Sequence, residues 1–153
     1  MFPKNSSLLK STALIGSDWR AAQDGATISV HNPSTCEHLG DVPKMGAIEA
    51  KEAVDAASAA LPAWRKQTAK ARSAILYKWY QLLLTNSEEL AKIMTAEQGK
   101  PLAEARGEVA YGASFLQWFA EEAKRGGGEI IPAVKDNTQV RVTREAAGVA
   151  AMI

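Results

Sequence analysis

Gly99, Lys100 and Pro101 stand in a row within the stretch TAEQGKPLAEARGEVAYG, residues 95–112. Glycine followed by lysine occurs in phosphate-binding loops, where backbone N–H groups and the lysine hold nucleotide phosphates. That loop also needs glycine where Met94 stands and serine or threonine where Pro101 stands. Neither position matches the phosphate-binding motif. The pattern therefore favours a joint in which one helix ends at glycine and the next begins at proline.

The glycine triplet 126–128 is a second candidate for nucleotide binding. A dinucleotide-binding fingerprint follows a strand and opens a helix, whereas this triplet follows a helical pattern. Ile131 also occupies the position of the third glycine of that fingerprint. The triplet therefore predicts the end of a helix.

Cys36 lies in the turn-like stretch NPSTCEHLG, with His38 two residues later. A thiol nucleophile needs a nearby base or a helix N-terminus, and a thiol in a polar turn is usually incidental. With His31 the two residues are too few and oddly spaced for a zinc site. We predict no catalytic residue and no metal site here. A single cysteine also excludes an internal disulfide, which fits a reducing compartment.

Two further side-chain sets on the segment after Pro101 allow more than one interpretation. Glu104 and Glu108 could form an acid–base pair, but Lys100 four residues before Glu104 favours a solvated charged face. Aromatic residues at helical spacing are more often core than pocket, and both alternatives stay open for this set. The aromatic residues are Tyr111, Phe115 and Trp118.

Composition and charge exclude some functional classes. The formal net charge is +1, so there is no electrostatic case for binding nucleic acid or an anionic membrane. The densest basic cluster fits a solvated helix face; it comprises Arg65, Lys66, Lys70 and Arg72. No stretch approaches the ~18 apolar residues of a membrane span, and the N-terminus lacks the apolar core of a secretory signal. We expect a cytoplasmic protein.

Hydrophobic periodicity predicts a helix-rich chain with short strands. Pro62 is expected to break or restart the first helix. The expected elements are a strand at 27–33 with a hairpin partner at 39–43, helices from Gly46 and over 70–85, a third helix capped by Ser87, and a fourth from Pro101 to about Arg125.

Near the C-terminal end the period of the hydrophobic pattern changes from 3.6 residues, as in a helix, to 2 residues, as in a strand. The segment 138–145 alternates as a strand with one wet face. The apolar run 149–153 is typical of a strand buried on both faces of a parallel sheet. Such a strand needs neighbours on both edges, and no residues remain to supply them, so we expect the chain to be part of a larger fold.

The segments NPST, ALPAWRKQTAKARSAILYKW, EELAKIMTAEQGKPLAEARGEV and REAAGVAAMI follow one another in this sequence. In this order they resemble the N-terminal third of the aldehyde dehydrogenase superfamily. The stretch EQGKPLAEARGEVAYGASFLQWFAEEAKR is similar, more narrowly, to the succinate-semialdehyde dehydrogenase branch, which includes relatives acting on glutarate semialdehyde. The resemblance covers about residues 10–153. Ala146 and Gly127 depart from the family's usual proline and aromatic residue.

The resemblance implies an α/β fold: the N-terminal helical layer and first strands of a Rossmann-like cofactor domain, incomplete in this chain. Residues 1–137 would form the helix-rich part of the NAD(P)-binding domain. Residues 138–147 would form an oligomerisation strand. Residues 148–153 would be the truncated first strand of the Rossmann-like sheet.

The resemblance also implies a function, namely NAD- or NADP-dependent oxidation of a semialdehyde to a carboxylic acid by a homo-oligomer. The family's catalytic cysteine, glutamate and asparagine are expected after Ile153, so the chain alone is expected to be inactive. Met152 and Ile153 match the edge of the cofactor pocket, and Tyr111 and Phe115 match positions at the substrate entrance. The alternative is a non-catalytic helical interaction module whose 138–145 strand pairs with a partner.

Overall fold

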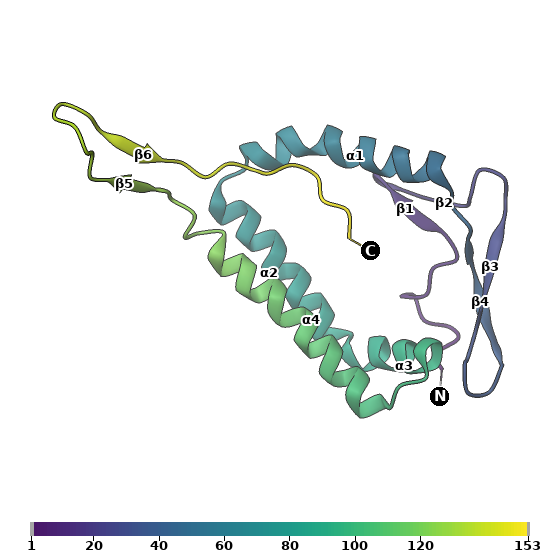
Figure 1. Cartoon of the computed structure of the whole chain (residues 1–153). Coiled ribbons are helices and arrows are strands. Elements are labelled where there is room, and N and C mark those ends of the chain that lie inside the picture. The colour runs from purple at the N-terminus through teal and green to yellow at the C-terminus, as the bar shows by residue number, and fades with distance from the viewer. Residues whose placement is uncertain (1, 153) are drawn as a thin grey trace.

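The structure is a computed structural model that describes residues 2–152, in which two short antiparallel hairpins precede a run of helices and a third hairpin follows it (Figure 1). The first hairpin pairs β1 (Ala13–Ile15) with β2 (Asp18–Arg20). The second pairs β3 (Thr27–His31) with β4 (His38–Pro43), which confirms the hairpin expected from the sequence. The turn of this second hairpin contains the NPST segment, residues 32–35.

Four helices follow in the described chain: α1 (Ala47–Lys66), α2 (Ala69–Thr85), α3 (Ser87–Gln98) and α4 (Leu102–Glu122). The start of α1 is held by Glu49, whose carboxylate accepts the N–H groups of Gly46 at 2.9 Å and Gln23 at 3.0 Å. These two bonds hold the pKa of Glu49 below its usual value. The Thr68 hydroxyl caps α2 by accepting the N–H of Ala71 at 3.2 Å.

The helical packing centres on α4, which lies beside α2 and is crossed near its start by α3 (Figure 1). Ala91 of α3 and Ala105 of α4 are completely buried, and Val109 is nearly so. Small side chains at this contact let the helix backbones approach closely. Partly buried apolar residues close the cluster around them: Leu90, Met94 and Leu102.

The buried part of the described chain is small. No large side chain in residues 2–152 is fully buried, and many large apolar side chains are exposed. A folded domain normally buries residues of this kind. The molecule therefore has the surface of a partial domain. Exposed examples from the helices are Ile75, Trp79, Leu82, Trp118 and Phe119.

Pro62 does not break α1, so that prediction was wrong. The helix continues through Pro62 to Lys66. Proline removes the hydrogen bond that would reach the carbonyl of Ser58. Both Pro62 and Ser58 are exposed, so water can satisfy the freed carbonyl and the helix persists.

Other helix boundaries differ from the predictions by a few residues. Asn86, and not Ser87, is the cap between α2 and α3; its side chain donates to the carbonyl of Leu82 at 2.8 Å. Pro101 precedes α4 as its cap, and α4 ends at Glu122, earlier than the expected Arg125. The α-helical pattern ends there because the N–H groups of Lys124 and Arg125 bond to carbonyls only three residues earlier.

After α4 the chain forms a third hairpin that projects away from the helices (Figure 1). It pairs β5 (Glu129–Ile131) with β6 (Val140–Val142). Only these three residues of the predicted 138–145 strand are paired, and both faces of the strand are exposed, not one. The segment then returns toward α1, where the guanidinium of Arg65 binds the carboxylate of Glu145 at 2.9 Å.

The apolar run 149–153 forms no strand within the described residues 149–152. Val149 is 41% exposed and Met152 95% exposed. A strand buried on both faces needs paired neighbours, and no strand of the described chain lies beside this run. Ile153 lies outside the described residues. Its assignment to a first Rossmann-like strand stays a prediction.

Candidate functional site

The Gly99–Pro101 segment is a helix joint, as the sequence predicts. Gly99 ends α3 with φ of 82°, a left-handed conformation that favours glycine, and its N–H donates to the carbonyl of Thr95 at 2.9 Å. Lys100 is largely buried and pairs with the carboxylate of Glu108. The lysine is therefore engaged within the fold, which argues further against a phosphate loop.

The joint contacts the turn of the second hairpin. A Cβ placed on Gly99 would lie 2.9 Å from Cγ of Pro33. Two segments that carry the family resemblance, NPST and EQGKP, thus meet in space.

The acidic residues at the start of α4 form a solvated face. Glu104 and Glu108 are both exposed, as expected for charge pairing and not for acid–base chemistry. Lys100 pairs with Glu108 instead of Glu104, because Lys100 lies before the helix and not on its surface lattice.

Another ion pair links α3 to α4 and was not anticipated from the sequence. Arg106 donates two hydrogen bonds to the Glu88 carboxylate, from Nε at 2.7 Å and from an Nη at 3.0 Å. The Arg106 hydrogen bond is the main cause that lowers the pKa of Glu88 to about 2. The two residues are distant in sequence, and only their two adjacent helices bring them together.

Cys36 is an exposed free thiol in the β3–β4 turn, with φ of 57°. The nearby His38 turns toward Asp41, with Nε2 3.3 Å from the carboxylate oxygen, and its ring contacts His31 edge-on at 5.3 Å. No base among the described residues 2–152 is bonded to the thiol. In residues 2–152 no group of three His, Cys, Asp or Glu side chains is arranged to hold a metal ion.

The glycine triplet leads from α4 into β5, so it does not open a helix. Gly128 has φ of 80°, and a Cβ there would collide with the carbonyl oxygen of Val142. Glycine is required at this position by the close approach of β6. The triplet is therefore a helix exit and hairpin entry, and not a dinucleotide loop.

The aromatic stripe of α4 lies on the side away from its buried alanines. Tyr111 is 66% exposed, Phe115 46% and Trp118 60%. The rings of Tyr111 and Phe115 meet edge-on, with centroids 4.9 Å apart. The three side chains line an open hollow of about 540 Å³ together with Ser114, Phe119 and Glu121. The assignment of Tyr111 and Phe115 to a substrate entrance stays a prediction.

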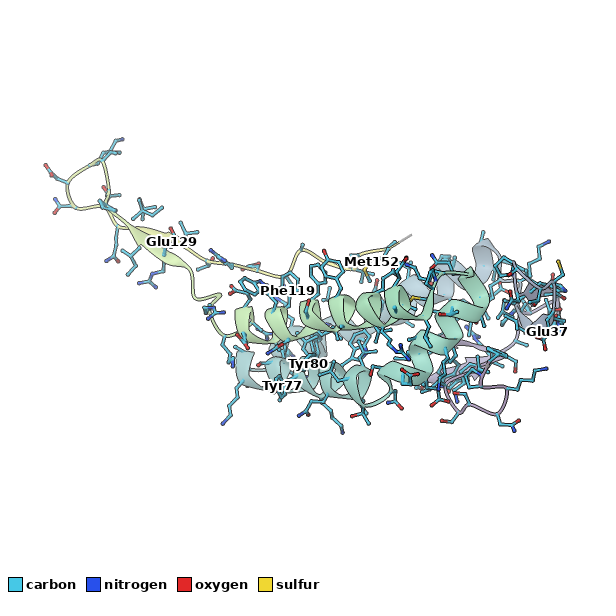
Figure 2. The ribbon with its side chains drawn as sticks, turned by 90° about the horizontal axis from the view of Figure 1, so that it is seen from below. Glu37, Tyr77, Tyr80, Phe119, Glu129 and Met152 are labelled. Atoms are coloured by element: carbon cyan, nitrogen blue, oxygen red, sulfur yellow. The ribbon has the colours of Figure 1, made fainter. Side chains whose placement is uncertain are left out.

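Met152 is the described residue of the two that are predicted to lie at the edge of the cofactor pocket. Met152 is drawn at the end of the extended C-terminal segment, well away from Glu129 of the projecting hairpin (Figure 2). Met152 is 95% exposed, and its place at the edge of a cofactor pocket stays a prediction. Ile153 lies outside the described residues. Among the described helices, none is long and apolar enough to cross a membrane.

The comparisons with known proteins agree over nearly the whole chain. It is 51% identical over 150 residues to a glutarate-semialdehyde dehydrogenase of Pseudomonas putida, covering 98% of this chain and 31% of the relative. It is 49% identical over 149 residues to the NADP(+) succinate-semialdehyde dehydrogenase of Escherichia coli, covering 97% of this chain and 31% of that protein. The chain thus spans about a third of the length of these curated relatives.

A solved structure shares the same arrangement. The crystal structure of succinate-semialdehyde dehydrogenase from Burkholderia pseudomallei matches with a TM-score of 0.86 and 53% identity, covering 90% of this chain and 29% of that chain. The sequence model of the aldehyde dehydrogenase family matches residues 19–153. The joint at Gly99, its contact with the NPST turn and these matches lead to one conclusion: the chain belongs to the aldehyde dehydrogenase family.

Proposed function

We propose that this chain forms the N-terminal part of an enzyme that oxidises a semialdehyde to a carboxylic acid with NAD or NADP. The observation that carries the proposal is the similarity over 98% of the chain to a glutarate-semialdehyde dehydrogenase and over 97% to a succinate-semialdehyde dehydrogenase. We further propose that the complete enzyme is a cytoplasmic homo-oligomer, with the 138–147 segment contributing to assembly. The exposed edges of β5 and β6 support that role, because open strand edges pair with other chains.

Within that enzyme, we assign Tyr111 and Phe115 to the substrate entrance. Support comes from their exposure, their edge-on contact and the hollow that they line with Trp118. Entrances of this kind are lined mostly by apolar and aromatic groups. Met152 and Ile153 are assigned to the edge of the cofactor pocket. A nicotinamide cofactor, when bound, accepts the hydride that leaves the aldehyde carbon.

The 153-residue chain by itself is proposed to be inactive. Support comes from Cys36, which is exposed and is bonded to no base of residues 2–152. The direct test incubates the purified chain with NAD or NADP and with succinate or glutarate semialdehyde, and follows the reduced cofactor. Turnover above a protein-free blank would refute this part of the proposal.

A chimera tests the proposal that this chain is the N-terminal part of a semialdehyde dehydrogenase. The matching N-terminal portion of the Escherichia coli enzyme is replaced by this chain, and oxidation of succinate semialdehyde is measured. We expect turnover within about tenfold of the parent, because about half of the residues in this portion are identical in the two proteins. A chimera that assembles and binds NADP like the parent but shows no turnover would contradict the proposal.

The entrance assignment is tested in the same chimera. Tyr111→Ala and Phe115→Ala should raise KM for the semialdehyde by about three- to tenfold with a smaller change in kcat, since they remove uniform binding contacts. Glu104→Gln, also exposed on α4 but outside the aromatic hollow, is the matched control and should leave KM unchanged. An equal change of KM in all three variants would contradict the assignment of Tyr111 and Phe115 to the substrate entrance.

A non-catalytic interaction module is the second candidate, favoured by one observation. The projecting β5–β6 hairpin exposes Ile130 (68%) and Val140 (40%) on strands with open edges. Such a module has to fold as an independent unit. A sharp, cooperative thermal transition of the 153-residue chain would favour it, and a broad transition would favour a portion of the larger enzyme.

A further inference from the structure

A cationic hollow lies where four parts of the chain meet, away from the aromatic hollow of α4. It is formed at the end of α1, the start of α2, the end of α4 and the segment 144–146, and its volume is about 460 Å³. The side chains that matter for its chemistry are Trp64, Arg65, Arg72, Arg144 and Glu145. It shares no lining residue with the aromatic hollow.

Three guanidinium groups line this hollow against one carboxylate. Arg65 is bonded to Glu145 at 2.9 Å, which neutralises one positive charge. Arg144 has only a distant partner, the carboxylate of Glu129 at 3.9 Å. Arg72 is half-buried and donates one bond to the backbone carbonyl of Gln67, and no carboxylate of residues 2–152 pairs with it. The hollow therefore keeps a surplus of positive charge.

The part of α1 and α2 beside the hollow supplies no carboxylate to balance these charges. Between Asp55 and Glu88 there is no acidic residue, while Lys66 and Lys70 add further positive charge beside the three arginines. Cations held together in this way repel one another, at a cost set by their separation and by the solvent. A fold that departs locally from charge balance commonly does so at a binding site.

We propose that this hollow binds a phosphate group, either free phosphate or the phosphate of a small monoester. The planar guanidinium fork matches phosphate oxygens with two parallel bonds, and arginine is the residue most used for this purpose. Arg72 and Arg144 supply such forks from different segments of the chain. The volume lies within the range of small-molecule sites, and the ring of Trp64 with Ala123 and Ala146 offers an apolar wall to the organic part of a monoester.

This site is separate from the proposed oxidation, and its test needs no turnover. The 153-residue chain is titrated by calorimetry with sodium phosphate, in a buffer whose ionic strength is held constant with sodium chloride. A parallel titration uses glycerol phosphate. Saturable binding is expected for phosphate, with none for chloride alone. Tighter binding of the ester would identify a monoester site, and equal binding a site for free phosphate.

Two variants and a matched control decide whether phosphate binds in this hollow. Arg144→Gln should weaken phosphate binding at least about fivefold, since it removes one charge-assisted donor pair. Arg144 lies outside every helix and strand, so circular dichroism should show unchanged helix content. Arg72→Gln tests the second fork. Arg141→Gln, an arginine of β6 outside the hollow, is the control and should bind like the unmodified chain.

The proposal is overturned if phosphate and chloride give the same binding heat at equal ionic strength. It is also overturned if Arg141→Gln weakens binding as much as Arg144→Gln, because the attraction would then follow net charge and not the hollow. If Arg72→Gln loses helix content, the comparison of Arg144→Gln with Arg141→Gln still decides, since both positions lie outside the helices.

Discussion

Pro33 packs against Gly99 so closely that any Cβ on Gly99 would lie 2.9 Å from the ring of the proline. The contact joins the turn between β3 and β4 to the joint between α3 and α4. Gly99 also has φ of 82°, where only glycine is unstrained. One residue thus meets a backbone and a packing requirement at the same time.

Gly99→Ala is expected to destabilise the chain by about 2 kcal/mol, from left-handed strain together with the clash at Pro33. The free energy of unfolding in urea measures this loss. Gly107→Ala on α4 is the control, because a Cβ there meets no heavy atom within 4 Å and alanine favours a helix. It should stabilise by about 0.5–1 kcal/mol. Equal effects at both positions would show that the Pro33 contact and the left-handed backbone have no role.

The Glu88–Arg106 pair predicts a dependence on acid pH. The pKa of Glu88 in the fold is about 2, against 4.5 for the free side chain. The ionised carboxylate therefore stabilises the fold above pH 4.5, and this contribution is lost as the pH falls toward about 2. Titration of the Glu88 carboxyl by NMR measures the pKa directly.

Arg106→Gln should move that pKa back toward 4.5, since the Arg106 hydrogen bond is the largest cause of the shift. Lys92→Gln is the matched comparison. Lys92 lies 3.4 Å from Glu88 and is a smaller cause, so its loss should raise the pKa less. The ion pair would be disproved as the cause by a Glu88 pKa that does not respond to Arg106→Gln.

The two faces of α4 should differ in their sensitivity to truncation. Val109 is 8% exposed against α3, so Val109→Ala should cost about 1–2 kcal/mol of unfolding free energy. Tyr111 is 66% exposed, so Tyr111→Ala should change stability by less than about 0.5 kcal/mol. Chemical denaturation of both variants checks the contrast. A cost for Tyr111→Ala as large as that for Val109→Ala would mean that the aromatic stripe is core.

Pro62 offers a stabilising change. Pro62→Ala restores an N–H that can bond to the carbonyl of Ser58, so the free energy of unfolding should rise by about 1 kcal/mol or more. Pro101→Ala is the comparison, since Pro101 precedes α4 and lacks no helical bond there. It should give no gain. A loss of helix content in the Pro62→Ala variant, seen by circular dichroism, would contradict the argument.

Local features were predictable because they depend on residues close in sequence. The joint at Gly99, the hairpin of residues 27–31 and 38–43, and the helical segments follow from turn chemistry and periodicity. Pro62 was misjudged because its cost depends on whether the freed carbonyl reaches water, which is a matter of exposure. The strand β5 was missed because three residues before a proline show no period.

The sequence by itself determined the family, the helical character and the joint, since these rest on local order and on motif identity. Only the tertiary structure decided which stripe of α4 is buried, that Pro33 meets Gly99, and that Arg144 joins the arginines of α1 and α2. The physical reason is that these relationships depend on the packing of segments distant in sequence. Hydrophobic periodicity indicates that a helix has an apolar face, but which face is buried depends on where the neighbouring helices pack.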